Sequence, residues 1–262
     1  MALQGARGSP SCSAPRLLRD GDYTLRAEHF DELRTAIVCL RRIRPSTRSA
    51  RMTRQRVVLA TRNVKKLAEL QRILADQSQD VQVLGLAGVA AYPEPAETER
   101  TFEGNALLKA RACVAATGLP ALADDSGLAV DVLNQMPGVR SARWAGPAAS
   151  DEDNNALLLG QLADVPAAER TARFVCAMAL VLPDGTEHVR IGEMRGRIAV
   201  SPAGHNGFGY DPLFVADGYA VTNGELEPSA KDAISHRGRA VRAILPVLLA
   251  ELRRLEPVAR EG

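Results

Sequence analysis

Two adjacent carboxylates, Asp124 and Asp125, follow a short apolar run and precede Ser126 and Gly127. The apolar run predicts a buried strand that ends at the pair. Buried adjacent carboxylates cost free energy unless a cation balances their charge, and Mg²⁺ does so readily. One carboxylate could hold the metal and also orient a water molecule for attack. The alternative is an Asp-Ser-Gly turn with solvent-facing acids, leading into a second strand over residues 127–132.

An acidic, proline-containing loop lies upstream of this pair. It carries Glu94, Glu97 and Glu99. One of these carboxylates could add a ligand to a metal site at Asp124 and Asp125, since Mg²⁺ prefers oxygen ligands.

A polar turn between a strand and a helix offers a phosphate site. The predicted strand 56–61 runs through Thr61 and Asn63 into a helix predicted over Val64–Ala75. The free amides and the dipole of a helix start attract phosphate, and Lys66 adds positive charge. The Walker pattern G-x-x-x-x-G-K-[ST] is absent from the sequence. An ordinary helix cap is the alternative.

A glycine-rich loop, residues 204–212, combines three glycines with two aromatic side chains and an acid. Glycine lets the backbone approach a ligand closely. Phe208 or Tyr210 can stack on a base, and backbone amides or Asp211 can read its edge. The alternative is a wide loop closed by a hydrophobic plug.

Lys231, His236 and Arg237 form a cluster that we place at the start of the closing helix. A cluster of this kind suits phosphate or base recognition. A solvated basic face is the alternative.

The elements that must position these residues follow an α/β pattern. Helical periodicity and capping residues predict helices over residues 64–75, 101–117, 151–162 and 240–255, with Ser150 as a cap and Gly118 as a stop. Further strands are predicted over residues 81–84 and 119–123. Residues 171–182 and 187–198 are predicted to form a hairpin that turns at residues 183–185.

Composition excludes several classes of protein. The chain has 262 residues, of which 46% are hydrophobic and 24% charged, unlike a disordered, collagen-like or disulfide-scaffold protein. Four cysteines without a C-x-x-C pair indicate reduced thiols in a cytosolic protein. No apolar run is long enough for a membrane span. Acids outnumber bases in residues 52–262, which argues against nucleic-acid binding.

Lysine is rare in this chain, with four Lys against 29 Arg. A lysine that survives in such a composition can be needed as a compact point charge. Codon bias with random survivors is the alternative.

Residues 1–51 differ from the rest of the chain. They contain ten Arg, no Lys and five acids, with one helix predicted over residues 27–42. We expect an N-terminal extension that is largely disordered, or a start assigned too early, with Met52 as the natural start. Residues 52–262 are expected to form the catalytic domain.

The motifs together resemble those of a known family, the inosine triphosphate pyrophosphatases. The stretches that carry the resemblance are VVLATRNVKKLAEL (57–70), TFEGNALLKARA (101–112), PALADDSGLAVDVLNQMPGVRSARWAG (120–146), PAGHNGFGYDPLF (202–214) and SAKDAISHRGRA (229–240). The combination of DDSGL, GFGYDP and AISHRG is specific. One departure is Gly104, which stands where the family often has Glu.

The resemblance implies a long mixed central sheet with helical lobes flanking a nucleotide-binding cleft, usually in a homodimer. It implies hydrolysis of ITP, dITP and XTP to the monophosphate and pyrophosphate with Mg²⁺, in the cytoplasm, to cleanse the nucleotide pool. Asp125 is the implied general base, and Glu97 and Asp125 are the implied metal ligands. The implied substrate contacts are Thr61, Arg62, Asn63, Val64, Lys65, Lys66, Lys109, Ser126, Phe208, Gly209, Tyr210, Asp211, Lys231, His236 and Arg237.

The preference for these bases has a physical basis. Hypoxanthine and xanthine carry an oxygen at C6 where adenine carries an amine, so a donor aimed at C6 favours them and leaves the amine unpaired. Guanine shares the oxygen and needs a separate rejection of its 2-amino group. A pyrophosphatase for modified pyrimidines and a nucleotide-binding regulator without catalysis are the competing hypotheses.

Overall fold

One six-stranded mixed sheet forms the centre of the part of the chain that the structure describes. The computed structural model describes residues 55–75 and 81–255. The strands are β1 (Gln55–Leu59), β2 (Val81–Gly85), β3 (Ala121–Val130), β4 (Thr171–Val181), β5 (Glu187–Ile198) and β6 (Phe214–Ala216). Their order is β2-β1-β3-β4-β5-β6. β1 pairs in parallel with β2 and β3, and the remaining pairs are antiparallel.

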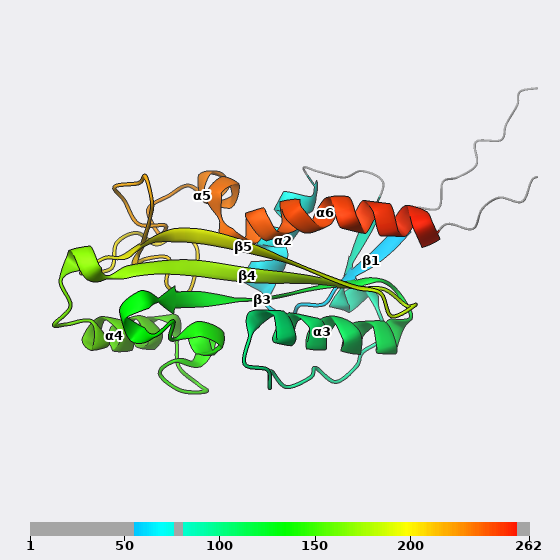
Figure 1. The fold of residues 1–262 in the computed structure, drawn as a ribbon, viewed down its shortest axis with the longest axis horizontal. Helices are drawn as coiled ribbons and strands as arrows, with labels where there is room; N and C mark the ends of the chain where they lie inside the picture. Colours follow the sequence, from blue (N-terminus) through cyan, green and yellow to red (C-terminus); the bar gives the residue numbers. More distant parts are fainter. Residues whose placement is uncertain (1–54, 76–80, 256–262) are drawn as a thin grey trace, which may run out of the picture. The chain divides into compact units, whose positions relative to one another are not determined.

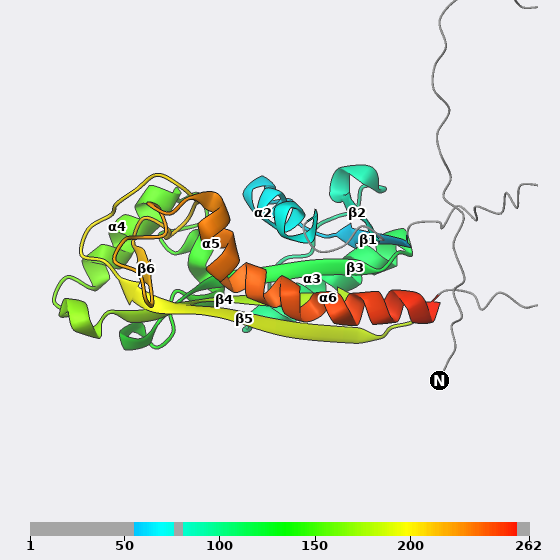
Figure 2. The ribbon, with the colours of Figure 1, turned by 90° about the horizontal axis from the view of Figure 1, so that it is seen from above.

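Helices cover both faces of the sheet. The α-helices are α2 (Val64–Ala75), α3 (Phe102–Thr117), α4 (Asp151–Gln161), α5 (Pro228–Ile234) and α6 (His236–Leu255). Short 3₁₀ helices are η2 (Leu86–Gly88), η3 (Asp131–Leu133), η4 (Gly138–Arg143) and η5 (Ala167–Glu169). Figure 1 shows α3 and α6 on opposite faces of the long strands, and Figure 2 shows α6 running along β4 and β5.

Strand alternation sorts the core into two layers. Val57 and Leu59 pack with α2 and α6, whereas Val58 and Ala60 pack with α3. This is the period of two that a strand imposes on its side chains. A third cluster joins α4, the outer half of β3 and the β6 region around Phe214.

The sheet leaves an opening beside β3. β1 ends at Leu59, while β3 begins beside it at Ala121 and runs on to Val130. The parallel order β2-β1-β3 makes the boundary of β1 and β3 a switch point, where ligands commonly bind beyond the carboxyl ends of strands.

Most predicted elements are confirmed. α2 has the predicted bounds, and α3 is capped by Thr101 and ends at Gly118, whose φ is +66°. Ser150 caps α4 in a reciprocal pair with Asp153. The hairpin of β4 and β5 is present in full register. The helix predicted over residues 27–42 and the division at residues 51 and 52 lie outside the described residues.

Two predictions of local structure are wrong. The strand does not end at Asp124, because β3 continues through the carboxylates to Val130 and replaces the two strands expected there. Cations on both faces of the sheet make this possible, as described below. The closing helix begins at His236, not at residue 240, and Lys231 lies in the separate helix α5.

Gly104 fits its place for a local reason. A Cβ at Gly104 would lie 2.7 Å from the Cβ of Glu99, so the small residue makes room for the acidic loop. Within residues 55–75 and 81–255, no helix is both long and apolar enough to cross a bilayer.

Candidate functional site

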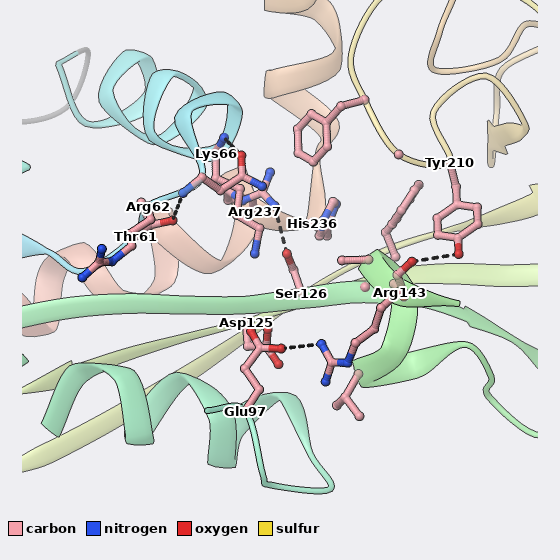
Figure 3. A pocket seen from close by; sticks show the side chains of 18 of the residues that line it. Thr61, Arg62, Lys66, Glu97, Asp125, Ser126, Arg143, Tyr210, His236 and Arg237 are labelled. Atoms are coloured by element: carbon pink, nitrogen blue, oxygen red, sulfur yellow. Dashed lines mark hydrogen bonds and ion pairs between the residues drawn. The ribbon is translucent and has the colours of Figure 1, made fainter. Parts of the chain in front are cut away.

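A cleft of about 240 Å³ lies beyond the end of β1, beside β3, and brings most of the predicted residues together (Figure 3). Most of the predicted substrate and metal residues line it: Thr61, Arg62, Asn63, Lys66, Glu97, Lys109, Asp125, Ser126, Phe208, Gly209, Tyr210, Asp211 and Lys231. His236 and Arg237, at the start of α6, line it as well. Residues far apart in the sequence therefore meet at one opening.

The start of α2 forms one wall of the cleft. The Asn63 side-chain oxygen accepts the Lys66 amide at 3.1 Å, so Asn63 caps the helix. The Thr61 hydroxyl accepts the Asn63 amide at 3.3 Å. These bonds fix the turn that aims the Lys66 side chain across the cleft, where its Nζ lies 3.0 Å from Asp124.

The neighbouring residues Arg62, Val64 and Lys65 make contacts other than those of Asn63 and Lys66. Arg62 donates to the Tyr92 carbonyl at 2.8 Å and pairs with Glu94 at 3.2 Å. Val64 and Lys65 are not part of the cleft lining: Val64 is 76% exposed, and Lys65 pairs with Asp151 at the rim. Contact of Val64 with a ligand would have to come from its backbone amide.

Asp124 and Asp125 face opposite sides of the sheet. Asp124 is buried against α2 and α6, where its Oδ2 lies 3.0 Å from Lys66 Nζ and 3.4 Å from Arg237 Nε. Ser126, two residues on, shares this face and accepts from Arg237 at 2.9 Å. Burial opposes ionisation of Asp124, but the two cations outweigh it and hold the pKa of its carboxyl below the ordinary range.

Asp125 points to the α3 side (Figure 3). Its carboxylate accepts from Asn105 at 3.1 Å and from Lys109 at 3.3 Å. Burial raises the pKa of Asp125, and nearby Glu97 adds to the rise, while Lys109 opposes it. A raised pKa brings a carboxylate closer to the value that a general base needs at neutral pH.

Glu97 and Asp125 form a pair of carboxylates bridged by one cation. Lys109 lies 3.1 Å from Glu97 and 3.3 Å from Asp125, and Arg143 lies 2.8 Å from Glu97. Burial raises the pKa of Glu97, but Lys109 and Arg143 outweigh it and lower the value. The same acids outweigh the burial of Lys109 and raise its pKa.

This acid pair is consistent with Mg²⁺ but not with a closed metal cage. No group of three or more His, Cys, Asp or Glu side chains gathers as a metal site among the described residues. Mg²⁺ commonly uses one or two carboxylates together with substrate phosphates. The oxygens of Glu97 and Asp125 and the unfavourable proximity of their charges fit that pattern.

The opposite end of the cleft carries an aromatic ring among cations. The Phe208 ring centre lies 5.3 Å from Lys231 Nζ and 5.7 Å from the guanidinium carbon of Arg237. Tyr210 is buried, and its hydroxyl donates to the Ser141 carbonyl at 2.9 Å. Tyr210 therefore anchors the loop to the Ser141 segment, and the Phe208 ring is the aromatic group available to a base in the cleft.

Asp211 is fully engaged inside the protein. Its carboxylate accepts from Lys231 at 2.5 Å, from the Phe208 amide at 2.9 Å and from Asn223 at 3.2 Å. The side chain is buried together with that of Lys231. The carboxylate therefore holds the loop in shape.

His236 lies on the floor of the same end. Its ring stacks on Phe174 at 4.9 Å, and its Nδ1 is buried without a hydrogen-bond partner. Burial lowers the pKa of His236 well below the ordinary value, and the cations Arg237, Lys231 and Lys66 lower it further. The ring is neutral at neutral pH and offers both a donor and an acceptor.

The four lysines of the chain all lie at or beside this cleft. Lys66, Lys109 and Lys231 line it, and Lys65 pairs with Asp151 at its rim, 3.5 Å away. This supports the interpretation that lysine persists here for its charge.

Sequence reasoning missed several lining residues. Arg143, Asp151 and Phe174 line the cleft, and Asn105 contacts Asp125 from behind. Arg143 and Asn105 lie in stretches that carry the family resemblance, which was the only signal for them.

Comparisons with known proteins agree with this geometry. A model of the Ham1 family matches residues 57–247. The dITP/XTP pyrophosphatase of Nocardia farcinica is 61% identical over 206 residues, covering 78% of this chain and 100% of that protein. The corresponding protein of Cutibacterium acnes is 57% identical, covering 75% of this chain and 98% of that protein.

Solved structures match as well. A nucleoside-triphosphatase / dITP/XTP pyrophosphatase from Mycobacterium abscessus is 55% identical with a TM-score of 0.62, covering 73% of this chain and 100% of that one. A HAM1 protein from Coxiella burnetii is 40% identical with a TM-score of 0.69, covering 75% of this chain and 99% of that one.

Proposed function

Because the chain belongs to the Ham1 family, we propose that it hydrolyses non-standard purine nucleoside triphosphates, ITP, dITP and XTP among them, to the monophosphate and pyrophosphate. The observation that carries the proposal is a cleft whose two ends differ chemically. Asp125, a carboxylate with a raised pKa, lines the same cleft. Lys66 and Lys109 serve the phosphate end, and Phe208 serves the base end. The reaction would remove these non-standard triphosphates from the pool of nucleotides available to polymerases.

At the phosphate end, the protein supplies charge and orientation. Lys66 and the free amides at the start of α2 bind phosphate oxygens, and Lys109 reaches the same region from α3. Asp125 takes a proton from the attacking water, because its raised pKa suits a base and Asn105 fixes its orientation. Asp124 holds Lys66 and Arg237 in position from the other side of the sheet.

Glu97 and Asp125 are the residues that would hold Mg²⁺, with the phosphates of the substrate as further ligands. The metal supplies positive charge to the phosphate oxygens when bound. Lys109 contacts both carboxylates, and together with Arg143 it lowers the pKa of Glu97 and keeps that residue ionised before binding.

At the base end, the available groups favour a carbonyl over an amine. The Asp211 carboxylate is buried and already accepts from three donors, so it is a poor acceptor for the 6-amino group of adenine. Arg237 and Lys231 carry donors only and suit the C6 oxygen of hypoxanthine or xanthine. Phe208 stacks on the ring.

Assembly and location belong to the same proposal. A second copy of the chain is the expected partner, neither a nucleic acid nor a membrane. The cytoplasm is the expected compartment, a choice supported by the free thiols of Cys113 and Cys176. Light scattering on the purified protein measures the oligomeric state.

The test is Mg²⁺-dependent release of pyrophosphate from a panel of triphosphates. The proposal predicts fast release from ITP, dITP and XTP and slow release from ATP and GTP. A preference for modified pyrimidine triphosphates would favour a related pyrophosphatase, and binding without release would favour a regulatory protein.

A further inference from the structure

One residue of the base-binding loop is held at both ends of its backbone by a single helix. The amide of Gly209 donates to Asp151 Oδ2 at 2.8 Å, and the carbonyl of Gly209 accepts from the Asn155 side-chain amide at 3.0 Å. Asp151 is the first residue of α4, and Asn155 lies four residues later on the same helix face. The two side chains together form a clamp on one peptide segment.

The clamp holds a residue of the loop that has no side chain to pack. Gly209 has a φ of +61°, and a Cβ there would meet nothing within 4 Å, so no packing of its own holds it. Its neighbour Phe208 is the aromatic ring at the base end of the cleft. Other bonds of the loop hold the Phe208 amide, the Tyr210 hydroxyl and the Phe208 carbonyl, which accepts from the Asp211 amide at 3.2 Å. The side-chain bonds to the amide and carbonyl of Gly209 itself come from Asp151 and Asn155.

Asp151 also reaches across the cleft. The oxygen that accepts from Gly209 lies 3.5 Å from Lys65 Nζ on α2, and Lys65 Nζ lies 5.7 Å from the Phe208 ring centre. Both side chains of this pair are largely exposed, so the pair contributes little stability by itself. The bond to Gly209 is therefore the contact through which Asp151 acts.

We infer that Asp151 and Asn155 are positioning residues for base recognition, which hold Gly209 so that Phe208 meets the purine ring in a fixed orientation. This inference rests on the proposed function, since it takes the loop as the base site. Both residues act through Gly209, so their loss weakens binding of the base and leaves binding of phosphate groups unchanged.

The variants separate the parts of the clamp. Asp151→Ala removes the acceptor for Gly209, and Asn155→Ala removes the donor. Asp151→Asn keeps an acceptor of the same shape and removes only the charge that faces Lys65. Glu152→Ala is the matched control, because it removes an acid from the same first turn of α4 and its side chain is exposed.

The readout is the dissociation constant of two probes, measured by calorimetry. Inosine monophosphate carries the base, and inorganic tripolyphosphate carries only phosphates. Losing one hydrogen bond of the clamp is expected to weaken inosine monophosphate about tenfold in Asp151→Ala and in Asn155→Ala. Tripolyphosphate is expected to change less than about twofold. Asp151→Asn, which keeps an acceptor but loses its charge, is expected to weaken inosine monophosphate less than Asp151→Ala does. Glu152→Ala is expected to bind both probes as the unchanged protein does.

Equal weakening of both probes, or no weakening of inosine monophosphate, would overturn the inference. Failure of the unchanged protein to bind inosine monophosphate would overturn it too, because the loop would then not be a base site. Hydrolysis of ITP by the unchanged protein is measured separately. A protein that binds inosine monophosphate through the clamp but releases no pyrophosphate would contradict the proposed function and leave this inference standing.

Discussion

Replacing Asp125 by Asn and Asp124 by Asn changes two adjacent, nearly isosteric positions, yet the structure predicts opposite effects on stability. A carboxyl group whose pKa rises on folding binds a proton more readily in the folded chain, so its ionised form costs stability at neutral pH. Asp125→Asn removes that cost. Asp124 has a lowered pKa, so its ionised form stabilises the folded chain, and Asp124→Asn loses that contribution.

The magnitudes follow from the partners of each residue. Asp124→Asn removes the carboxylate that both the buried Arg237 and the mostly buried Lys66 contact. Breaking a buried ion pair costs about 3–5 kcal/mol of folding free energy. Because the amide of Asn keeps some hydrogen bonding, we expect the lower end of this range for Asp124→Asn. At about 2–4 °C per kcal/mol for a domain of this size, Tm falls by about 6–12 °C. Asp125→Asn keeps the same Tm or raises it.

For activity the ranking of the two variants is reversed, and Asp125→Asn is expected to lose more than Asp124→Asn. Asp125→Asn loses a general base, which contributes about 10²–10⁴-fold to rate. Asp124→Asn retains the base and loses only the positioning of Lys66 and Arg237, for which about 10–100-fold is expected.

Thermal melts in EDTA and steady-state pyrophosphate release from ITP measure both effects. Added Mg²⁺ is expected to raise the Tm of the unchanged protein more than that of Asp125→Asn. Equal falls in Tm for the two variants would refute the opposite orientation of their charges. An Asp125→Asn enzyme with unchanged kcat would refute its role as base.

Three further outcomes are expected. Lys66→Ala lowers kcat/KM for ITP by about 10- to 100-fold, mainly through KM, because a charge-assisted contact with phosphate is lost, and unchanged KM would contradict this. Gly192→Ala lowers Tm and raises KM, because a Cβ there would lie 2.1 Å from the His236 carbonyl oxygen and displace the start of α6 at a cost of about 1–3 kcal/mol; a melt that matches the unchanged protein would show that the helix adapts. A protein that starts at Met52 folds and keeps full activity, since every described site residue follows that position, and loss of either on truncation would show that residues 1–51 are needed.

Local signals in the sequence predicted the helices well. Asn63 and Ser150 cap α2 and α4 through bonds to residues within the next turn, and Gly118 ends α3, so each boundary is set by neighbours in the chain. Short elements such as β6 and α5 were missed, because three to seven residues carry little periodicity.

The break predicted in β3 shows where local reasoning fails. Adjacent carboxylates suggest a turn when only the chain around them is considered. In the fold, alternation sends Asp124 toward Lys66 and Arg237 and Asp125 toward Lys109, so each charge is balanced from a different helix. The partners lie up to 113 residues away in sequence, and no local pattern predicts them.

In the candidate site, too, some residues could be predicted from the sequence and others could not. The motifs of the resemblance identified residues that line the cleft, such as Lys66, Phe208 and Arg237. The residues that position them were not found, because their roles depend on tertiary contacts. Asp151 and Gly209 are 58 residues apart, and Arg143 and Glu97 are 46 apart.

The most direct measurement compares kcat/KM for ITP and ATP under identical Mg²⁺ concentrations, with inosine monophosphate and pyrophosphate identified as products. The account predicts that ITP is cleaved far faster than ATP, because Lys231 and Arg237 at the base end of the cleft offer donors to a C6 oxygen while the buried Asp211 carboxylate is already engaged by three donors. Equal kcat/KM for the two nucleotides would contradict it.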